Sequence, residues 1–487
     1  MQTLIITDKP KNWPLQLKGV KLVGAKDYLL DQKYDHMYKA RVFNICRSYS
    51  YQTYGYYVSL IAAARGHKPI PSIATIQELK NVSIVKIVSE EMEETMQKAL
   101  ARIESDRFTL SIYFGKNLAT KYDHLSRQIY NSFQSPFLKA EFKKRDKWFL
   151  QSVRAISANE IPEAHLDFVL KTAKQYFSSK RFVTHTREHA QYDLAILFNP
   201  QEENPPSDEK AIQKFIDAGH KIGINSYVIH KEDYADIAQY DALFIRETTS
   251  VNHHTYRFAR KAMAEGLIVI DHPDSIEKCA NKVFLAELLR RYNIPHPNTL
   301  IVHKANRAEV VSKIGLPCVL KQPDSAFSLG VFKAETEEKL NEYLDLLLKQ
   351  SDLIIAQEFL PTEFDWRVVV LDKQPLTVCK YHMAKKHWQI QRNEPGKTEY
   401  GKVEAFDVAE VPTKVVNTAI KIANAIGDGF YGVDIKEKDG KIYVIEVNDN
   451  PNIEAGYEDK FLKDTLYLKI MRYFQRKIDE QKEKNRK

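Results

Sequence analysis

Short apolar runs alternate with amphipathic stretches through the middle of the chain. Apolar residues at helical spacing predict helices over 210–218 and 256–265. Four apolar runs predict strands around these helices, at 193–198, 227–230, 242–245 and 267–270. Because strands that alternate with helices usually pair in parallel, we expect a small parallel sheet flanked by helices over residues 190–273.

Residues 1–185 also mix strand and helix patterns, and we expect a separate α/β domain there. The run 40–46 is typical of a buried strand, and a tyrosine-rich stretch leads into an apolar helix over 57–65. Packing in a core or an interface explains those tyrosines better than a binding platform does. A polar and basic stretch at 178–191 is the candidate linker, and the sequence shows no internal repeat.

From residue 274 onward the pattern changes. The sequence Asp274-Ser-Ile-Glu277 resembles a capped helix start, and we expect one helix from there to about Arg291. Strands, short helices and hairpins follow up to about residue 450, and a closing helix is expected over 459–474. At 487 residues the chain is long enough for about three domains.

The composition is that of a soluble globular protein, with 44% hydrophobic and 28% charged residues. No apolar run approaches the roughly 18 residues of a membrane span, and the amino terminus lacks the layout of a signal peptide. The four cysteines lie far apart, without zinc or redox spacing: Cys46, Cys279, Cys318 and Cys379. We therefore expect a reducing, cytoplasmic setting and no membrane partner.

The net charge of +8 raises the question of a nucleic-acid partner. Most of the excess lies in two short segments, 139–147 with a net +3 and 472–487 with a net +4, so the rest of the chain is nearly neutral. Solvated helices explain both segments better than a binding face, although 139–147 could touch an acidic partner. We expect no nucleic-acid partner, and a basic tail over 476–487.

The sharpest chemical signal is a hairpin that contains Asp434, Glu446 and Asn448. A three-residue loop over 438–440 would place these three side chains on one face, whereas a two-residue loop would put Asp434 and Glu446 on opposite faces. Such oxygen ligands suit Mg²⁺ held jointly with nucleotide phosphates. The alternative, a solvated acidic face, is weaker because the strands are otherwise rich in Val and Ile.

Two other segments suit a nucleotide. Lys321 ends an apolar strand and precedes the small-residue loop 325–330, whose amides could cradle phosphates. Glu358 ends a second apolar strand and could face a purine ring, and Asp365 and Arg367 follow it. Many strand ends carry an exposed lysine, and a surface salt bridge explains Asp365 and Arg367 equally well.

Several motifs are discounted. Residues 427–432 match the spacing of a dinucleotide-binding loop, but a helix precedes them and a strand follows, which is the reverse of the required order. His253 and His254 are adjacent and cannot both point inward, and no Cys or His partner supports a zinc site at His382 and His387. No P-loop sequence occurs.

Taken in order over about 190–465, these features resemble the ATP-grasp ligases, and among them the RimK-like glutamate ligases. The front portion is similar to the accessory domain found ahead of some RimK-like grasp domains. The resemblance implies an α/β fold of α+β grasp type: an accessory domain at 1–185, a pre-ATP-grasp domain at 190–273, an ATP-grasp domain at 274–475 and the tail.

The resemblance also implies roles for single residues. Arg367 and Lys321 are the implied catalytic residues. The implied Mg²⁺ ligands, with Mn²⁺ as an alternative ion, are Asp434, Glu446 and Asn448. The implied ATP-binding residues are Lys282, Lys321, Ser328, Gly330, Glu358, Phe359, Leu360 and Asp365. In such enzymes a carboxylate attacks ATP to give an acyl phosphate, and an amine then displaces phosphate to form a peptide-like bond.

The substrate does not carry over. The loop after Lys321 has one glycine where RimK-like enzymes usually have more, and their arginine-rich substrate strand is replaced by a segment that contains Lys380 and His387. Arg246 and Glu247 could hold a small amino acid at a strand end, or form a structural ion pair. We expect an amino-acid or peptide substrate, with a protein tail and a homo-oligomer left open. An ATP-binding scaffold and a kinase-like phosphotransferase are the alternatives.

Overall fold

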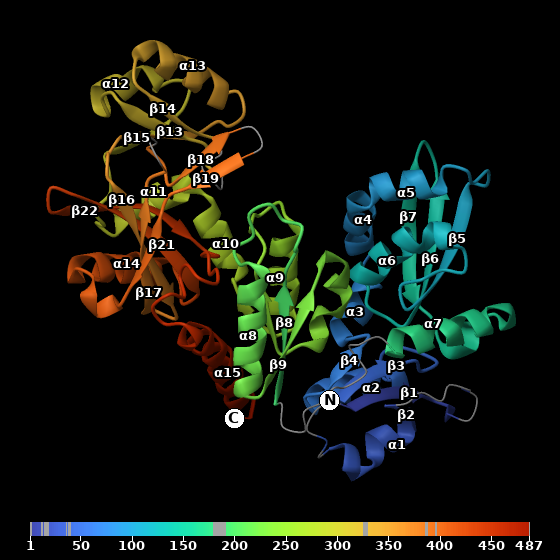
Figure 1. Cartoon of the computed structure of the whole chain (residues 1–487). Coiled ribbons are helices and arrows are strands. Elements are labelled where there is room, and N and C mark those ends of the chain that lie inside the picture. Colours follow the sequence, from blue (N-terminus) through green and yellow to red (C-terminus); the bar gives the residue numbers. More distant parts are fainter. Residues whose placement is uncertain are drawn as a thin grey trace. The chain divides into compact units, whose positions relative to one another are not determined.

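The computed structural model divides the chain into two compact units (Figure 1). Unit 1 comprises Met1–Arg187 with Tyr234–Gln239, and unit 2 comprises Glu188–Asp233 with Tyr240–Lys487. The structure describes residues 2–10, 13, 19–35, 37, 40–178, 191–324, 330–384, 388–394 and 397–486. Most of the predicted linker at 178–191 therefore lies outside the described residues, as do Ser328 and His387.

Unit 1 begins with a four-stranded parallel sheet in the order β2-β1-β3-β4. Its strands are β1 (Gln2–Thr7), β2 (Val20–Gly24), β3 (Ala40–Asn44) and β4 (Lys68–Ile70). Its helices are α1 (Ala25–Leu30), α2 (Tyr54–Ala64) and α3 (Ile73–Glu78). The predicted buried strand is confirmed as β3, whose five residues are all buried because helices cover both faces of a parallel sheet.

A second, antiparallel sheet completes unit 1 in the order β5-β6-β7. Its strands are β5 (Arg107–Tyr113), β6 (Phe137–Lys144) and β7 (Trp148–Ala155). The accompanying helices are α4 (Val82–Glu91), α5 (Glu93–Leu100), α6 (Asp123–Ser132) and α7 (Leu166–Ser178). The sheet and helices α4 to α6 share one apolar core, which makes unit 1 a mixed α/β body as predicted.

Unit 2 also begins with a parallel sheet, in the order β11-β10-β8-β9. Its strands are β8 (Tyr192–Leu197), β9 (Ile224–Ile229), β10 (Ala242–Ile245) and β11 (Ile268–Ile270). Helices α8 (Glu209–Lys221) and α9 (His254–Ala264) connect them. The predicted parallel sheet over 190–273 is confirmed.

The two parallel sheets repeat one arrangement. Both have their first strand between the second and the third, and the fourth beside the third. Helix α2 and strand β4 begin 200 residues before α9 and β11. Between residues 50 and 76, seven residues are identical at this spacing: Ser50, Tyr56, Ala62, Ala64, Gly66, Ile70 and Ile76 match Ser250, Tyr256, Ala262, Ala264, Gly266, Ile270 and Ile276. The prediction of no internal repeat is therefore wrong.

The expected helix from 274 to 291 is in fact two helices, α10 (Pro273–Ala280) and α11 (Lys282–Arg291). Asn281 has an extended backbone between them, and its side chain accepts hydrogen bonds from the amides of Val283 and Phe284. The cap of α10 is His272, with Pro273 in the first helical position, and not Asp274 as predicted.

An antiparallel sheet in the order β12-β15-β13-β14 follows. Its strands are β12 (Thr299–Val302), β13 (Cys318–Lys321), β14 (Val331–Ala334) and β15 (Ile354–Glu358). Helices α12 (Val310–Lys313) and α13 (Glu337–Leu347) accompany it. Residues from its strands and from both helices form one core, so the two helices cover the same face of this sheet.

The largest sheet has five antiparallel strands in the order β20-β17-β16-β21-β22. They are β16 (Phe364–Leu371), β17 (Gln374–His382), β20 (Val403–Phe406), β21 (Phe430–Lys438) and β22 (Lys441–Asn448). Helix α14 (Thr413–Ile426) packs on one face through a shared apolar core. A separate two-stranded sheet is formed by β18 (Gln391–Glu394) and β19 (Lys397–Tyr400).

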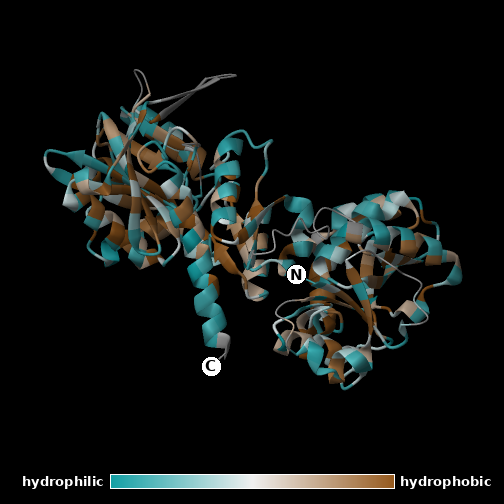
Figure 2. Ribbon diagram, turned by 60° about the horizontal axis from the view of Figure 1, so that its bottom comes forward, coloured by the Kyte–Doolittle hydropathy of each residue, from teal (hydrophilic) through white to brown (hydrophobic). Residues whose placement is uncertain are grey.

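The chain closes with α15 (Asp464–Arg486), which is longer than the predicted helix over 459–474. It packs beside α8 (Figure 1), and its first half joins the core of the parallel sheet. Figure 2 shows its C-terminal part in teal, hence hydrophilic. The predicted basic tail over 476–487 is helical through Arg486: Arg476 and Lys477 bind Asp372, 2.5 and 3.0 Å away, which anchors this turn. Among the described residues, no helix is both long and apolar enough to span a bilayer.

Candidate active site

The candidate site is built on the β21–β22 hairpin of unit 2. Its loop has two residues, Asp439 and Gly440, and not the three predicted. Both residues have positive φ, 53° and 71°, the conformation of a type I′ turn, for which Asp-Gly is a favoured pair. The predicted register is therefore wrong near the loop.

A β-bulge restores the expected arrangement farther along the hairpin. Ile435 pairs with Val444, but Asp434 pairs directly with Glu446, so β22 has one extra residue at this point. The extra residue returns Glu446 and Asn448 to the face of Asp434, whereas Val444 and Val447 point into the core beneath α14. The prediction that Asp434, Glu446 and Asn448 share one face is confirmed, for a reason that differs from the predicted one.

Arg367 on the neighbouring strand β16 holds Asp434. The two residues pair across the strands, and the guanidinium binds both carboxylate oxygens, with Nη2 at 2.8 Å from Oδ2 and Nε bonded to Oδ1. Both side chains are about nine-tenths buried. Although burial disfavours its charged form, the Asp434 carboxylate holds the pKa of Arg367 above its usual value.

The Tyr381 ring also contacts Arg367. The guanidinium carbon of Arg367 lies 5.1 Å from the centre of this ring, and the Tyr381 hydroxyl donates to Oε1 of Glu458 at 2.6 Å. Burial raises the pKa of Glu458 to about 7. Gly432 makes room for this arrangement, because a Cβ atom there would lie 2.9 Å from Pro451 and 3.0 Å from Cδ of Arg367.

Two lysines face Glu446. Lys282, the first residue of α11, places its Nζ 3.1 Å from Oε1 of Glu446, and its side chain is only 10% exposed. Although burial opposes ionisation, Lys282 and Lys321 hold the pKa of Glu446 below its ordinary value. The break at Asn281 is what brings Lys282 here, because it turns the start of α11 toward this sheet.

Lys321 ends β13 and donates from Nζ to Oε1 of Gln357 on the adjacent β15, at 2.8 Å. Burial lowers the pKa of Lys321 to about 8. A phosphate would restore the charge that burial disfavours, so this lysine is suited to an anionic ligand. The structure thus brings Lys282, Lys321, Glu446, Asp434 and Arg367 into one cluster.

The residues expected to hold the adenine and ribose lie around the end of β15. Glu358 is its last residue, and Leu360 is buried. The Phe359 ring lies 4.3 Å from Nζ of Lys333. Asp365 accepts from Nζ of Lys436 at 2.6 Å and from the Thr362 hydroxyl at 3.1 Å.

Some of these residues escaped the sequence analysis. Lys436 carries a signal that could have revealed it, because it lies two positions after Asp434 on a strand and hence on the same face. Lys333 and Tyr381 carried no such signal, because only the strand pairing places them beside Phe359 and Arg367. Gly330 has a φ of 72° and would clash with Gln322 if it carried a Cβ atom, so the end of the loop after β13 requires glycine.

The substrate candidates fare differently. Lys380 pairs with Trp366, and its Nζ lies 4.3, 4.6 and 5.2 Å from the rings of Phe364, Trp366 and Phe406. Since residues one apart on a strand point to opposite faces, Lys380 lies on the other side of the sheet from Arg367. The expectation that Lys380 faces the site is therefore wrong.

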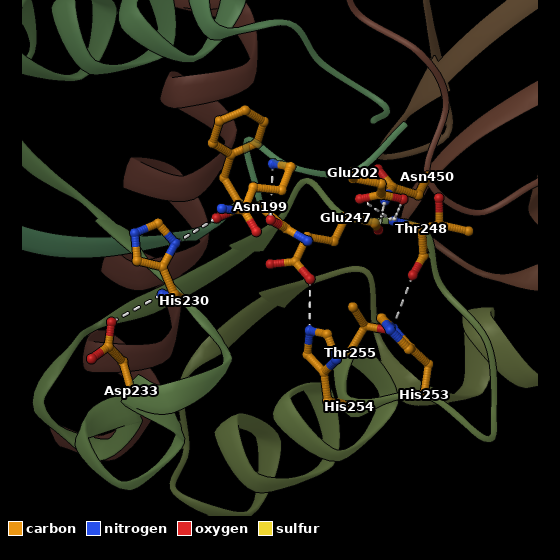
Figure 3. A network of polar contacts seen from close by, with 12 residues as sticks. Asn199, Glu202, His230, Asp233, Glu247, Thr248, His253, His254, Thr255 and Asn450 are labelled. Atoms are coloured by element: carbon orange, nitrogen blue, oxygen red, sulfur yellow. Dashed lines mark hydrogen bonds and ion pairs between the residues drawn. The ribbon is translucent and has the colours of Figure 1, made fainter. Parts of the chain in front are cut away.

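Arg246 is fully buried and does not pair with Glu247. Its guanidinium donates to Ser207 Oγ, Asn450 Oδ1 and the carbonyls of Pro206 and Pro451, at 2.5 to 3.0 Å. These bonds fasten segment 450–451 to the parallel sheet, so Arg246 has a structural role and is not placed to hold a substrate carboxylate. Glu247 instead contacts His254 (Figure 3).

Two regions of the chain match known protein families. Residues 279–473 match the family described as RimK-like ATP-grasp domain, and residues 25–172 match the RimK-like ATPgrasp N-terminal domain. The chain is 28% identical over 255 residues to the alpha-aminoadipate–LysW ligase LysX of Saccharolobus solfataricus, covering 49% of this chain and 88% of that protein.

A second relative is the tetrahydromethanopterin:alpha-L-glutamate ligase of Methanocaldococcus jannaschii, 25% identical over 214 residues, with 42% of this chain and 70% of that protein covered. Among solved structures, a RimK domain protein ATP-grasp from Sphaerobacter thermophilus is 15% identical with a TM-score of 0.44, over 58% of this chain and 98% of that one. The two matched domains, in this order and over well over half of the sequence, show that the chain belongs to the RimK-like ATP-grasp family.

Proposed function

We propose that this protein is an ATP-dependent carboxylate–amine ligase that forms a peptide-like amide bond, with an amino acid such as glutamate, or a peptide, as substrate. The observation that carries the proposal is one cluster of charged side chains. Asp434 and Glu446 share a sheet face, and two lysines and one arginine surround them. The relatives in the comparison are named as amino-acid ligases, which supports the same reaction class.

In this proposal ATP lies between the sheet of β12 to β15 and the sheet of β16 to β22. Lys282 and Lys321 contact its phosphates, together with the loop that includes Ser328 and ends at Gly330. Glu358, Phe359, Leu360 and Asp365 surround the nucleoside. The lowered pKa of Lys321, about 8 because of burial, supports its assignment to an anion.

ATP-grasp folds bind ATP together with a divalent metal, and we propose Mg²⁺, with Mn²⁺ as the alternative. Asp434, Glu446 and Asn448 would hold it. They fit a hard cation, because all three offer side-chain oxygens on one face, and Nδ2 of Asn448 lies 3.4 Å from Oδ2 of Asp434. Two carboxylates and one amide leave positions for phosphate oxygens, and the metal would neutralise phosphate charge.

The reaction has two steps. An oxygen of the substrate carboxylate attacks the γ-phosphorus of ATP, the bond to ADP breaks, and an acyl phosphate forms. The amine nitrogen then attacks the acyl carbon, phosphate leaves with the bonding electrons, and the nitrogen loses a proton. Arg367 supplies a fixed positive charge for the oxygens that become negative, because Asp434 holds it in place and keeps it charged.

The division into an accessory domain at 1–185, a pre-ATP-grasp domain at 190–273 and an ATP-grasp domain at 274–475 remains part of the proposal. The four cysteines are unpaired, which favours a reducing compartment such as the cytoplasm.

The proposal is tested by incubating the protein with ATP, Mg²⁺ and mixtures of amino acids, followed by assay of ADP and mass spectrometry of new amides. We expect ADP and an amide in equal amounts, and loss of both in Glu446→Ala. ATP binding without turnover would instead indicate a scaffold, and a stable phosphorylated product would indicate a kinase. Full ligase activity in Glu446→Ala would contradict the metal assignment.

A further inference from the structure

A second group of polar side chains lies at the carboxyl ends of β8 and β10 (Figure 3). Glu247 is the second residue after β10 and only 2% exposed. Its Oε2 lies 2.6 Å from Nε2 of His254 at the start of α9. Its other oxygen, Oε1, has no hydrogen-bond partner among the residues that the structure describes. Burying a carboxylate oxygen without a hydrogen-bond donor lowers the stability of the folded protein, so a functional reason for it is expected.

The surroundings of Glu247 are acidic. Glu202, in the loop after β8, accepts from the amide of Thr248 at 3.0 Å. Burial raises the pKa of Glu202, and the nearby Glu247 adds to this effect. Arg246 cannot neutralise the two carboxylates, because its bonds go to Ser207, Asn450 and two carbonyls. The missing partner of Oε1 is therefore a donor, and a cationic one fits best.

The internal repeat shows that the fold itself does not require Glu247. The amide of Ile45 donates to the carbonyl of Ile6 near the end of β1, and the amide of Arg246 donates to the carbonyl of Leu197 at the end of β8. The next residues, Cys46 and Glu247, therefore occupy equivalent places. Cys46 is buried and fills this place without a charge. Tyr54 opens α2 where His254 opens α9.

The hydrogen bond that Glu202 accepts, in contrast, has a counterpart in unit 1. In unit 1 the amide of Arg47 donates to Asp8 in the loop after β1, just as the amide of Thr248 donates to Glu202. A carboxylate bound to this amide is thus common to both repeats and belongs to the fold. Glu247 and His254 are particular to unit 2, which is the unit that contains the candidate active site.

Glu247 is close to that site along a short path. The side chain of Asn450 donates to the carbonyl oxygen of Glu247 at 2.7 Å, and Asn450 is only two residues beyond Asn448. Two residues of extended chain span at most about 7 Å. A small molecule held at Glu247 therefore reaches toward the place where the proposed acyl phosphate forms.

We propose that Glu247 binds the primary ammonium group of the amine substrate through Oε1, while His254 occupies and orients Oε2. The ammonium gives a proton to the Glu247 carboxylate, and the neutral amine nitrogen then attacks the acyl carbon. This inference rests on the proposed ligase function and names the end of the amine substrate that the protein recognises. Glu202 adds negative charge beside Glu247, and the hydrogen bond from the Thr248 amide holds its carboxylate in place. The ligand class is a free amino acid with a primary amino group.

The test measures binding and turnover separately. Thermal unfolding of the full chain with ADP and Mg²⁺ is followed with each of the twenty amino acids and with their N-acetyl forms. We expect at least one free amino acid to raise Tm and its N-acetyl form to leave Tm unchanged, since acetylation removes the ammonium. A wild-type protein that no free amino acid stabilises would overturn the site.

Two variants of Glu247 sharpen the result. Glu247→Gln keeps the shape without the charge, and Glu247→Cys introduces the residue that the first repeat tolerates at the same place. In both we expect the amino-acid shift to vanish and KM for the amine to rise at least tenfold, while KM for ATP changes less than twofold. Glu203→Gln, a neighbouring exposed acid, is the matched control and should behave as wild type.

The outcomes separate this inference from the proposed function. A protein that binds an amino acid through Glu247 but forms no amide contradicts the ligase proposal and leaves the ammonium site standing. A protein that forms the amide with unchanged KM for the amine in both Glu247 variants contradicts the ammonium site and leaves the ligase standing.

Discussion

At the scale of single residues, the site depends on charges that are buried and matched. Arg367 and Asp434 are both about nine-tenths buried and bind each other through two hydrogen bonds. Lys282 is bonded to Glu446, while the hydrogen bond that Lys321 makes within the described part of the chain goes to the neutral amide of Gln357. The Arg367–Asp434 pair therefore holds strands β16 and β21 together, whereas an anionic ligand would stabilise the charged form of Lys321.

Arg367→Ala should lower the free energy of unfolding by about 3–5 kcal/mol, because it leaves the Asp434 carboxylate buried without its partner. Chemical denaturation in the absence of nucleotide measures this change. Arg476→Ala is the control: it removes a half-exposed arginine from its pair with Asp372, which keeps Lys477 as a second partner, and we expect a loss of less than about 1 kcal/mol. Equal losses in the two variants would show that the Arg367 pair is not special.

ATP binding should take up a proton at Lys321. With a pKa of about 8, roughly a quarter of Lys321 is protonated at pH 8.5, and a bound phosphate raises that fraction toward one. Isothermal titration calorimetry at pH 8.5, in buffers of different ionisation enthalpy, should show uptake of roughly 0.7 proton per ATP. Uptake should disappear in Lys321→Met and persist in Lys339→Met, an exposed lysine. Equal uptake in both variants would contradict the assignment.

At the scale of elements, two local features place the functional side chains. The bulge between β21 and β22 returns Glu446 to the face of Asp434. The break at Asn281 divides α10 from α11 and makes Lys282 the first residue of a new helix. Both features concern one residue each, and each decides where a charged group lies.

Asn281→Ala should remove the cap of α11 and weaken ATP binding. We expect a loss of about 1 kcal/mol in the free energy of unfolding and a several-fold higher Kd for ATP, because Lys282 loses its fixed position. Asn81→Ala is a matched control, since Asn81 caps α4 of unit 1 through the amides of Ser83 and Ile84. The control should lose similar stability with an unchanged Kd. Unchanged ATP binding in Asn281→Ala would remove Lys282 from the site.

Elements that depend on the periodicity of apolar residues were predicted well from the sequence. Features that depend on a single residue, such as a bulge or a helix break, were predicted less well. The parallel sheet followed from alternation. The shared face of Asp434, Glu446 and Asn448 was predicted correctly, but it depends on a bulge that alternation does not reveal. The two-residue turn was signalled by Asp439-Gly440, but the compensating bulge has no sequence mark. Lys380 was misassigned because its face depends on the pairing of β16 with β17, which single-strand patterns do not contain.

At the scale of the whole molecule, the chain repeats one parallel α/β arrangement in two compact units. The repeat escaped the sequence analysis because seven identities over 27 positions are too scattered to notice without the matched elements. The second copy carries Arg246 and Glu247 at the end of its third strand, where the first carries Ile45 and Cys46. Polar side chains at this edge therefore distinguish the copy that belongs to the ATP-grasp unit.

Because the two units have separate cores, nucleotide should stabilise only one of them. In differential scanning calorimetry of the full chain, ADP with Mg²⁺ at about 100 times its Kd should add about 2.7 kcal/mol to unit 2 and move only its transition. Hydrogen exchange should slow in peptides from β13, β21 and β22, and not in those from β1 and β3. Equal stabilisation of both units would contradict a nucleotide site built from unit 2 alone.

The most direct test of the ligase reaction follows one oxygen atom. The substrate acid is labelled with ¹⁸O in its carboxylate and incubated with the protein, ATP, Mg²⁺ and the amine, and the inorganic phosphate is analysed by mass spectrometry. An acyl-phosphate route transfers one ¹⁸O to phosphate for each amide formed, and we predict this ratio. Amide formation with unlabelled phosphate, or ADP formation without any amide, would contradict the proposed reaction.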